Sequence, residues 1–257
     1  MCAIIGWVGK IDPSTLKNLF VLANNWGPHA VGLAYVDDHD GFNVWKKAYN
    51  DRTPAAIAFV REEVSLIRKA SKALTGMGHV RFGTHGSNTD RNAHPFEHEG
   101  LTFIHNGVIG NYSSIMPEAV VDSECLGMLI KQKNMTKAWG SNGLAWFEDN
   151  QLYVYRRNQH LNCFLCESPV DGSPLTLIAT SERIVPPNIE VVDQELIEEG
   201  RAYKVGTWSA DTAALTEIWN DIGNAPSYER SSIHTGYSEE LGEEEDGNGN
   251  SCPIEEV

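Results

Sequence analysis

The sequence has few positive charges and no cluster of them. Its 257 residues include 20 lysines and arginines against 35 aspartates and glutamates, which gives a formal net charge of -15. DNA, RNA and anionic membranes are polyanions, and proteins that bind them without sequence preference need clustered basic side chains. We therefore expect no nucleic-acid partner and no membrane partner.

Long apolar runs are also missing. The first ten residues, MCAIIGWVGK, have no positively charged segment, and their apolar stretch is too short for a secretory signal. No stretch approaches the length that a membrane-spanning helix needs. The five cysteines are an odd number, and without a signal peptide such a set is typical of reduced, intracellular proteins. We expect a cytoplasmic protein.

Motifs for nucleotides and metals are absent. The sequence contains neither GxxxxGK[ST] nor GxGxxG. The histidines of residues 79–105 lack a companion cysteine or acid at ligand spacing, and Pro95 breaks any helical pairing of His94 with His98. The CxxC at 163–166 lies in a strand pattern, whose alternation turns its two thiols to opposite faces. We expect no metal and no cofactor.

Helix and strand patterns are both present. Asp12-Pro13 is a helix start signal, and the apolar spacing after it predicts a helix over 13–24. Thr53-Pro54 repeats the signal and predicts a helix to about residue 69. Several strands are apolar on both faces, which favours sheets covered by helices. The predicted strands are residues 3–8, 31–36, 42–48, 76–82, 101–105, 143–148, 151–156, 161–166, 175–180 and 201–207.

Polar side chains suited to chemistry concentrate in residues 76–122. A long polar loop is predicted over 83–100, and loops of this length in compact domains are functional or disordered. Asn106-Gly107 is predicted as a tight turn after a strand, followed by a short helix over 108–115. Asp122 is predicted as the N-cap of a further helix.

Cys2 is a candidate nucleophile. Removal of Met1 would free its α-amino group, whose pKa of about 7.7–8.0 lies where a general base is effective at neutral pH. Nucleophile and base would then belong to one residue. The simpler alternative is a small residue that follows the initiator methionine, and Cys2 alone does not decide between them.

Two further segments suit an acyl-transfer site. The amide of Asn106 and the backbone N–H of Gly107 could together stabilise an oxyanion, although an ordinary Asn-Gly turn needs no such role. Arg81 could hold a carboxylate with its planar fork, or be a surface residue beside a flexible turn. Asp122 could face a substrate ammonium as well as cap a helix.

Six motifs in a fixed order resemble the glutaminase domain of class II glutamine amidotransferases, such as those of glucosamine phosphate synthase and amidophosphoribosyltransferase. The resemblance spans about residues 2–207. The motifs are Cys2 with AIIGWVG, GPHAVG at 27–32, HVRFGTHG at 79–86, NAHP at 92–95, IHNGVIGNY at 104–112 and DSE at 122–124.

The resemblance implies an α+β fold, the Ntn-hydrolase four-layer αββα sandwich, and an enzyme with an N-terminal cysteine nucleophile. L-glutamine would be hydrolysed to glutamate and ammonia through a thioester, with the freed α-amino group as base. Carried over by motif, the catalytic residues are Cys2, Asn106 and Gly107, and the glutamine-binding residues are Arg81, Thr84, His85 and Asp122.

The predicted organisation is a single amidotransferase domain over residues 2–210 and a C-terminal extension over 211–257. From about residue 226 the extension is acidic, rich in Gly, Ser and Asn, and without apolar periodicity, which predicts disorder. No synthase domain accompanies the resemblance. We therefore expect a glutaminase subunit that passes ammonia to a partner synthase.

Two alternatives remain. The family pattern has a Gly where this chain has Ala3, an Arg where it has Trp26, an acid where it has His29, and a Trp where it has Phe82. A changed pocket surround would fit a stand-alone amidase that acts on another γ-glutamyl substrate. The same departures, with the acidic tail, would also fit a catalytically silent binding protein that retains the fold.

Overall fold

Two antiparallel sheets lie face to face in the computed structural model, which describes residues 2–37, 41–50 and 52–221. In sheet order, the 7-stranded sheet consists of β11 (Val191–Glu195), β9 (Asn162–Glu167), β10 (Pro174–Ala179), β1 (Ala3–Val8), β4 (Thr75–Arg81), β2 (Ala30–Val36) and β3 (Phe42–Ala48). The 6-stranded sheet consists of β13 (Leu215–Asn220), β12 (Arg201–Val205), β8 (Gln151–Arg157), β7 (Gly140–Glu148), β6 (Leu101–Ile109) and β5 (Phe96–His98).

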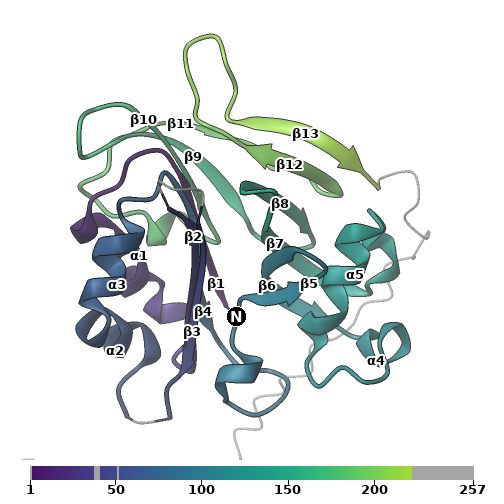
Figure 1. Cartoon of the computed structure of the whole chain (residues 1–257). Helices are drawn as coiled ribbons and strands as arrows, with labels where there is room; N and C mark the ends of the chain where they lie inside the picture. The colour runs from purple at the N-terminus through teal and green to yellow at the C-terminus, as the bar shows by residue number, and fades with distance from the viewer. Residues whose placement is uncertain (1, 38–40, 51, 222–257) are drawn as a thin grey trace, which may run out of the picture. The chain divides into compact units, whose positions relative to one another are not determined.

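Helices cover the outer face of each sheet (Figure 1). The 7-stranded sheet is covered by α1 (Pro13–Ala23), α2 (Ala55–Glu62) and α3 (Val64–Ala70), and the 6-stranded sheet by α5 (Leu126–Lys131), next to the short α4 (Tyr112–Ile115). The predicted four-layer αββα sandwich is thereby confirmed. No helix in the described part of the chain has the length and apolar character that crossing a bilayer requires.

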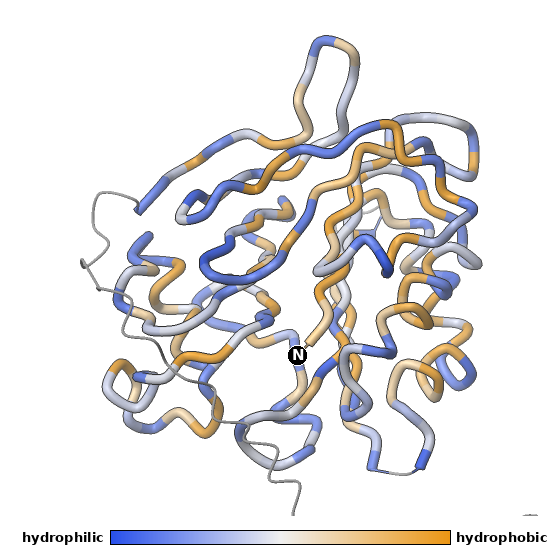
Figure 2. Tube along the Cα trace, turned by 180° about the vertical axis from the view of Figure 1, so that it is seen from behind, coloured by the Kyte–Doolittle hydropathy of each residue, from blue (hydrophilic) through white to orange (hydrophobic). Residues whose placement is uncertain are grey.

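Alternation along β1 sorts its side chains between two cores. Ala3, Ile5 and Trp7 pack under the helices, whereas Ile4 packs in the core between the sheets. Figure 2 shows hydrophobic stretches along the strands and hydrophilic ones at many of the loops. Because side chains alternate along a strand, Cys2 continues the row of Ile4 and faces the 6-stranded sheet.

The predicted helix over 13–24 is confirmed as α1. The Asp12 carboxylate accepts hydrogen bonds from the backbone N–H groups of Ser14 and Thr15, a cap that stabilises a helix by about 1 kcal/mol. The predicted helix to residue 69 is divided at Glu63, whose φ of -103° and ψ of 39° lie outside the helical region. Two shorter helices, α2 and α3, therefore replace one.

Three local predictions were wrong. Asn106-Gly107 is not a turn, because β6 continues to Ile109 and places Asn106 opposite Gly143 of β7. The helix predicted over 108–115 is for the same reason only the short α4. Asp122 does not cap a helix with its side chain. It begins a 3-10 turn, and its carboxylate accepts from the Ile109 N–H at 2.9 Å.

Three strands were not predicted: β5, β11 and β13. The last of these, β13, lies beyond the predicted domain boundary at residue 210 and pairs with β12. The boundary itself stays a prediction. The predicted disorder from residue 226 falls outside the described residues. Cys163 lies in the core between the sheets and Cys166 in the core under the helices, which confirms that the two thiols face opposite ways.

Candidate active site

Cys2 stands at the end of β1, between two neighbouring strands. On one side, the register of β1 with β4 places Ala3 opposite Val80, so Cys2 lies beside Arg81. On the other side, β1 pairs with β10, and Thr180 continues that pairing by donating its N–H to the Ile4 carbonyl at 3.2 Å. The Cys2 thiol is thus held at the mouth of the gap between the two sheets.

The Cys2 atoms contact both sheets. The Phe82 N–H donates to Sγ at 3.3 Å, and the Cys2 nitrogen donates to Asn106 Oδ1 at 3.0 Å. Burial raises the pKa of the thiol above its usual value, against smaller lowering effects from the Phe82 N–H and the Arg81 charge. The thiol is therefore protonated at neutral pH, so its use as a nucleophile requires a base.

Asn106 and Gly107 lie across the gap from Cys2, on β6. Asn106 Nδ2 is buried and has no hydrogen-bond partner among the described residues, while its Oδ1 accepts from Cys2. Gly107 has a φ of 153°, and a Cβ there would lie 1.9 Å from the Ser141 carbonyl oxygen, so only glycine fits. The site therefore contains a buried amide donor that is free to meet a ligand.

Arg81 and Asp122 stand on opposite walls. Arg81 Nη2 donates to the His85 carbonyl at 2.7 Å, whereas its buried Nη1 lacks a partner in the described structure. One Asp122 oxygen accepts from the Ile109 N–H, and the other lies 3.9 Å from His85 Nδ1. One guanidinium nitrogen and one carboxylate oxygen therefore remain for a ligand that carries both charges.

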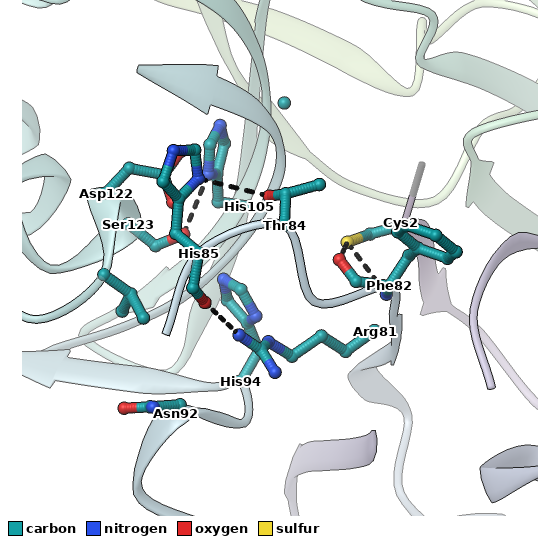
Figure 3. A pocket seen from close by; sticks show the side chains of 12 residues that line it. Cys2, Arg81, Phe82, Thr84, His85, Asn92, His94, His105, Asp122 and Ser123 are labelled. Carbon is teal, nitrogen blue, oxygen red and sulfur yellow. Dashed lines mark hydrogen bonds and ion pairs between the residues drawn. The ribbon is translucent and has the colours of Figure 1, made fainter. Parts of the chain in front are cut away.

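These side chains line one pocket, which Figure 3 shows with Cys2 and Phe82 on one side and His85, Asp122 and Ser123 on the other. Its enclosed volume is about 20 Å³, which is room for one water molecule. A larger ligand therefore needs more room than this conformation of the pocket provides.

Thr84 and His85 form the outer wall of the pocket. Thr84 Oγ1 lies 3.3 Å from His85 Nδ1, and the His85 ring meets Tyr112 edge-on with the centroids 5.7 Å apart. All seven residues that the resemblance selects thus come together: Cys2, Arg81, Thr84, His85, Gly107 and Asp122 line the pocket, and Asn106 contacts Cys2.

His29 also belongs to this site, and the sequence did not identify its role. The Nδ1 atom of its ring accepts from the Gly83 N–H at 2.8 Å, and its backbone N–H donates to the Arg81 carbonyl at 3.1 Å. Gly27 packs so closely that a Cβ would lie 2.3 Å from the Arg81 carbonyl carbon. Burial, followed by the Arg81 charge, lowers the pKa of His29. The motif at 27–32 thereby supports the loop that follows Arg81.

Two buried histidines, His94 and His105, line the pocket, and a third, His79, packs behind them. The rings of His79 and His94 lie 4.0 Å apart, and His105 Nδ1 lies 2.9 Å from Ser123 Oγ. Burial lowers the pKa of all three, that of His79 to about 3, so they are neutral at physiological pH. In residues 2–37, 41–50 and 52–221, no three His, Cys, Asp or Glu side chains are grouped as metal ligands.

Curated relatives match most of the chain. It is 35% identical over 229 residues to glutamine–fructose-6-phosphate aminotransferase (isomerizing) of Bacillus subtilis, an alignment that covers 77% of the chain and 35% of the relative. The same enzyme of Oceanobacillus iheyensis is 35% identical over 235 residues, 79% of the chain and 36% of the relative. The chain thus spans about a third of the length of these relatives. No family profile matches the sequence.

Solved structures share the fold. Glutamine phosphoribosylpyrophosphate amidotransferase from Bacillus subtilis, complexed with ADP and GMP, superposes with a TM-score of 0.62 over 84% of the chain and 49% of that structure, at 16% identity. A second structure, described as the allosteric regulatory enzyme of purine biosynthesis, gives a TM-score of 0.59 over 80% of the chain and 47% of its own, at 18% identity. The αββα sandwich is therefore the Ntn-hydrolase fold.

Proposed function

Because the chain is homologous to the glutaminase domain of class II glutamine amidotransferases, we propose that it hydrolyses L-glutamine to glutamate and ammonia through a thioester on Cys2. The observation that carries the proposal is a pair of buried donors without partners among the described residues, Asn106 Nδ2 and Arg81 Nη1, beside the Cys2 thiol. A buried donor that lacks a partner costs about 1–3 kcal/mol, and a bound ligand would recover that cost.

The reaction begins at the Cys2 nitrogen. Once Met1 is removed, the α-amino group takes the thiol proton, and Asn106 Oδ1, at 3.0 Å, holds that nitrogen in place. The thiolate attacks the side-chain carbonyl carbon of glutamine. Negative charge then develops on the carbonyl oxygen, where Asn106 Nδ2 and the Gly107 N–H stabilise it; one such donor contributes about 3–4 kcal/mol.

The tetrahedral intermediate collapses when the C–N bond breaks. The α-ammonium group of Cys2 returns its proton to the departing nitrogen, ammonia leaves, and the γ-glutamyl group stays on Sγ as a thioester. Water, deprotonated by the same α-amino group, then attacks the thioester carbonyl and releases glutamate. The raised pKa of the thiol makes this base necessary, because little thiolate exists without it.

The charged end of glutamine fits the two opposite walls. Arg81 Nη1 pairs with the α-carboxylate, and the Asp122 oxygen that is not bound to Ile109 accepts from the α-ammonium. Thr84 and His85 close over the substrate from the outer wall. Holding both charges fixes the distance from the α-carbon to Cys2 and so selects the length of the side chain.

The ammonia passes to a partner synthase. The relatives are aminotransferases by name, and the chain spans 35% of the length of the Bacillus subtilis relative. The part of that relative that the chain does not match is large enough to hold a further domain.

The test is intact-mass analysis and peptide mapping after incubation with a glutamine-like diazoketone, with Cys2→Ala as the control. We expect the wild-type chain to lack Met1, to carry one adduct on Cys2 and to release glutamate from glutamine. Cys2→Ala should carry no adduct and release no glutamate. Cys125, Cys163 and Cys166 are buried and have raised pKa values, so they remain unmodified. A chain without Met1 that neither reacts nor releases glutamate, even with its synthase, would refute the proposal.

A further inference from the structure

A second cavity, separate from the glutamine pocket, is lined in part by the residues that follow β10, the neighbour of β1. It has a volume of about 410 Å³, within the range of roughly 300–1,000 Å³ that small-molecule sites occupy. It shares no lining residue with the pocket of Figure 3. We call it the side groove, and its lining includes Trp26, Gln159, Asn162, Ser181, Arg183 and Gln194.

One wall of the side groove continues the strand next to Cys2. Thr180 accepts from the Ile4 N–H through Oγ1 at 2.8 Å, and Ser181 follows it in the chain. Because β1 lies between β4 and β10, Arg81 flanks Cys2 on one side and the Thr180–Ser181 wall flanks it on the other. The Thr180–Ser181 wall of the side groove therefore lies at the end of the strand that adjoins β1 on the side away from Arg81.

The second wall is Trp26. The next residue, Gly27, approaches the loop after Arg81 so closely that a Cβ would lie 2.6 Å from the Phe82 nitrogen. That nitrogen donates to Cys2 Sγ. Trp26 therefore precedes a glycine that packs against Phe82, the residue whose N–H donates to the Cys2 thiol.

The third wall is Gln159, near the other sheet. A Cβ on Gly143 would lie 3.1 Å from Gln159 Cγ and 3.4 Å from the Asn106 carbonyl oxygen. Gly143 is the register partner of Asn106. Each of the three walls is therefore adjacent, through the backbone or a packed glycine, to a residue that contacts Cys2 or closely follows it in the chain.

The lining combines an indole with amides and a cation. Asn162 Nδ2 is occupied by the Ala179 and Thr180 carbonyls, which fixes the floor. The Arg183 guanidinium forms no hydrogen bond or ion pair in the described part of the chain that would compete with a ligand. Glu182 also lines the groove, so a single carboxylate beside Arg183 suits it better than a phosphate with two charges.

We propose that the side groove binds the amine portion of γ-glutamyl amides, specifically an amino acid or short peptide whose carboxylate pairs with Arg183. This inference rests on the proposed function of Cys2. The γ-glutamyl group occupies the glutamine pocket, and the substituent on the amide nitrogen extends past Cys2 into the groove. The chain then acts on substituted amides, of which glutamine is the unsubstituted case.

The step balances as it does for glutamine. The C–S bond forms as the thiolate attacks the amide carbonyl, and the C–N bond breaks. The departing amine takes the proton that the Cys2 α-ammonium received from the thiol, and it leaves through the groove. Water then cleaves the thioester, which releases glutamate and restores the thiol.

The experiment measures glutamate release from three substrates by the full chain: glutamine, γ-glutamylglycine and γ-glutamylethylamide. The last has no carboxylate. Since a hydrogen bond to a charged group contributes about 1.5–3 kcal/mol, kcat/KM for γ-glutamylglycine should exceed that for γ-glutamylethylamide about tenfold or more.

Two variants locate the binding. Gln194→Trp fills the groove from the exposed edge strand β11, and the ratio of kcat/KM for γ-glutamylglycine to that for glutamine should fall about tenfold. Val192→Trp, on the same strand outside the groove, is its control and leaves the ratio unchanged. Arg183→Gln should abolish the preference for γ-glutamylglycine over γ-glutamylethylamide, and Arg61→Gln on α2 should retain it.

The outcomes separate this inference from the proposed function. Release of glutamate from glutamine alone, or equal ratios in Gln194→Trp and Val192→Trp, would overturn the side groove and leave the glutaminase intact. Release from γ-glutamylglycine but not from glutamine would support the groove and overturn the glutaminase. No release from any substrate by a chain without Met1 would overturn both.

Discussion

Two buried clusters of charge differ in how completely they are paired. Near the end of the 6-stranded sheet, Arg157 Nη2 donates to Asp221 at 2.8 Å, Tyr155 donates its hydroxyl to the same carboxylate at 3.1 Å, and the Asp221 N–H donates to the Gly200 carbonyl. At the Cys2 site, by contrast, Arg81 Nη1 and Asn106 Nδ2 are buried without partners among the described residues.

The difference separates stability from function. The Arg157 cluster satisfies its polar atoms within the chain, so it needs no ligand and fastens the last described strand to its sheet. The Cys2 site keeps donors that cost stability until something binds them. Substitutions in the first cluster should therefore lower stability without affecting activity, and substitutions in the second should do the reverse.

The largest expected effect is that of Asn106→Ala. Loss of an oxyanion donor should lower kcat for glutamate release by about 10²–10³. The melting temperature should fall only slightly, because the lost Nδ2 has no partner in the described structure and a single hydrogen bond, from the Cys2 nitrogen to Oδ1, is removed.

Steady-state glutamate release and thermal unfolding check this prediction, with Asn220→Ala on the exposed β13 as the control. The control should change neither quantity beyond its error. A large fall in melting temperature with kcat unchanged would mean that Asn106 belongs with the Arg157 cluster, as a structural residue.

The paired variants Arg81→Gln and Arg157→Gln test the comparison directly. Arg81→Gln should raise KM for glutamine about 10–100-fold, since hydrogen bonds to charged groups contribute about 1.5–3 kcal/mol. Arg157→Gln should leave KM unchanged and lower the free energy of unfolding by about 3 kcal/mol, because Asp221, with a side chain 1% exposed, loses its cation.

Urea unfolding and steady-state kinetics measure both effects on the same preparations. The comparison requires the two variants to behave oppositely. If Arg157→Gln also raised KM, or if Arg81→Gln destabilised the fold as much as Arg157→Gln does, the contrast between the two clusters would be lost.

Local sequence signals predicted the parts of the fold that local physics determines. The Asp12 cap and the apolar spacing after it were sufficient for α1, and alternation was sufficient for Cys163 and Cys166. Asn106-Gly107 was misread because the dipeptide by itself favours a turn. Here β7, a strand formed by residues much later in the chain, holds both residues extended.

The candidate site was also predictable only in part from the sequence. The motifs selected the residues that surround Cys2, but no local pattern shows which of their atoms are left without partners. The bond from the Ile109 N–H to Asp122 and the bond from the Gly83 N–H to His29 join segments whose proximity only the fold creates. The side groove is likewise formed by separate segments of the chain, and no sequence motif predicts it.

The smallest expected effect concerns His29, whose Nδ1 must be unprotonated to accept from the Gly83 N–H. Its pKa is lowered below the usual 6.5 by burial and by the Arg81 charge. Because the pKa of His29 is lower in the folded state than in the unfolded chain, the hydrogen bond that neutral His29 accepts contributes its full stability at a pH above the pKa of the unfolded state. That contribution is lost as the pH falls from about 6.5 through the folded pKa. Protonation would break the bond and place a second cation beside Arg81.

We therefore expect KM for glutamine to rise a few-fold as the pH falls below the usual histidine range, because the loop after Arg81 loses its support. His29→Gln, whose amide oxygen can still accept from Gly83, should flatten this acidic change, whereas a pH change that arises from the Cys2 α-amino group would appear mainly in kcat and remain in the variant. An unchanged acidic rise of KM in His29→Gln would assign the titration to another group. His29 would then be, like Arg157, a residue that stabilises the fold without taking part in the site.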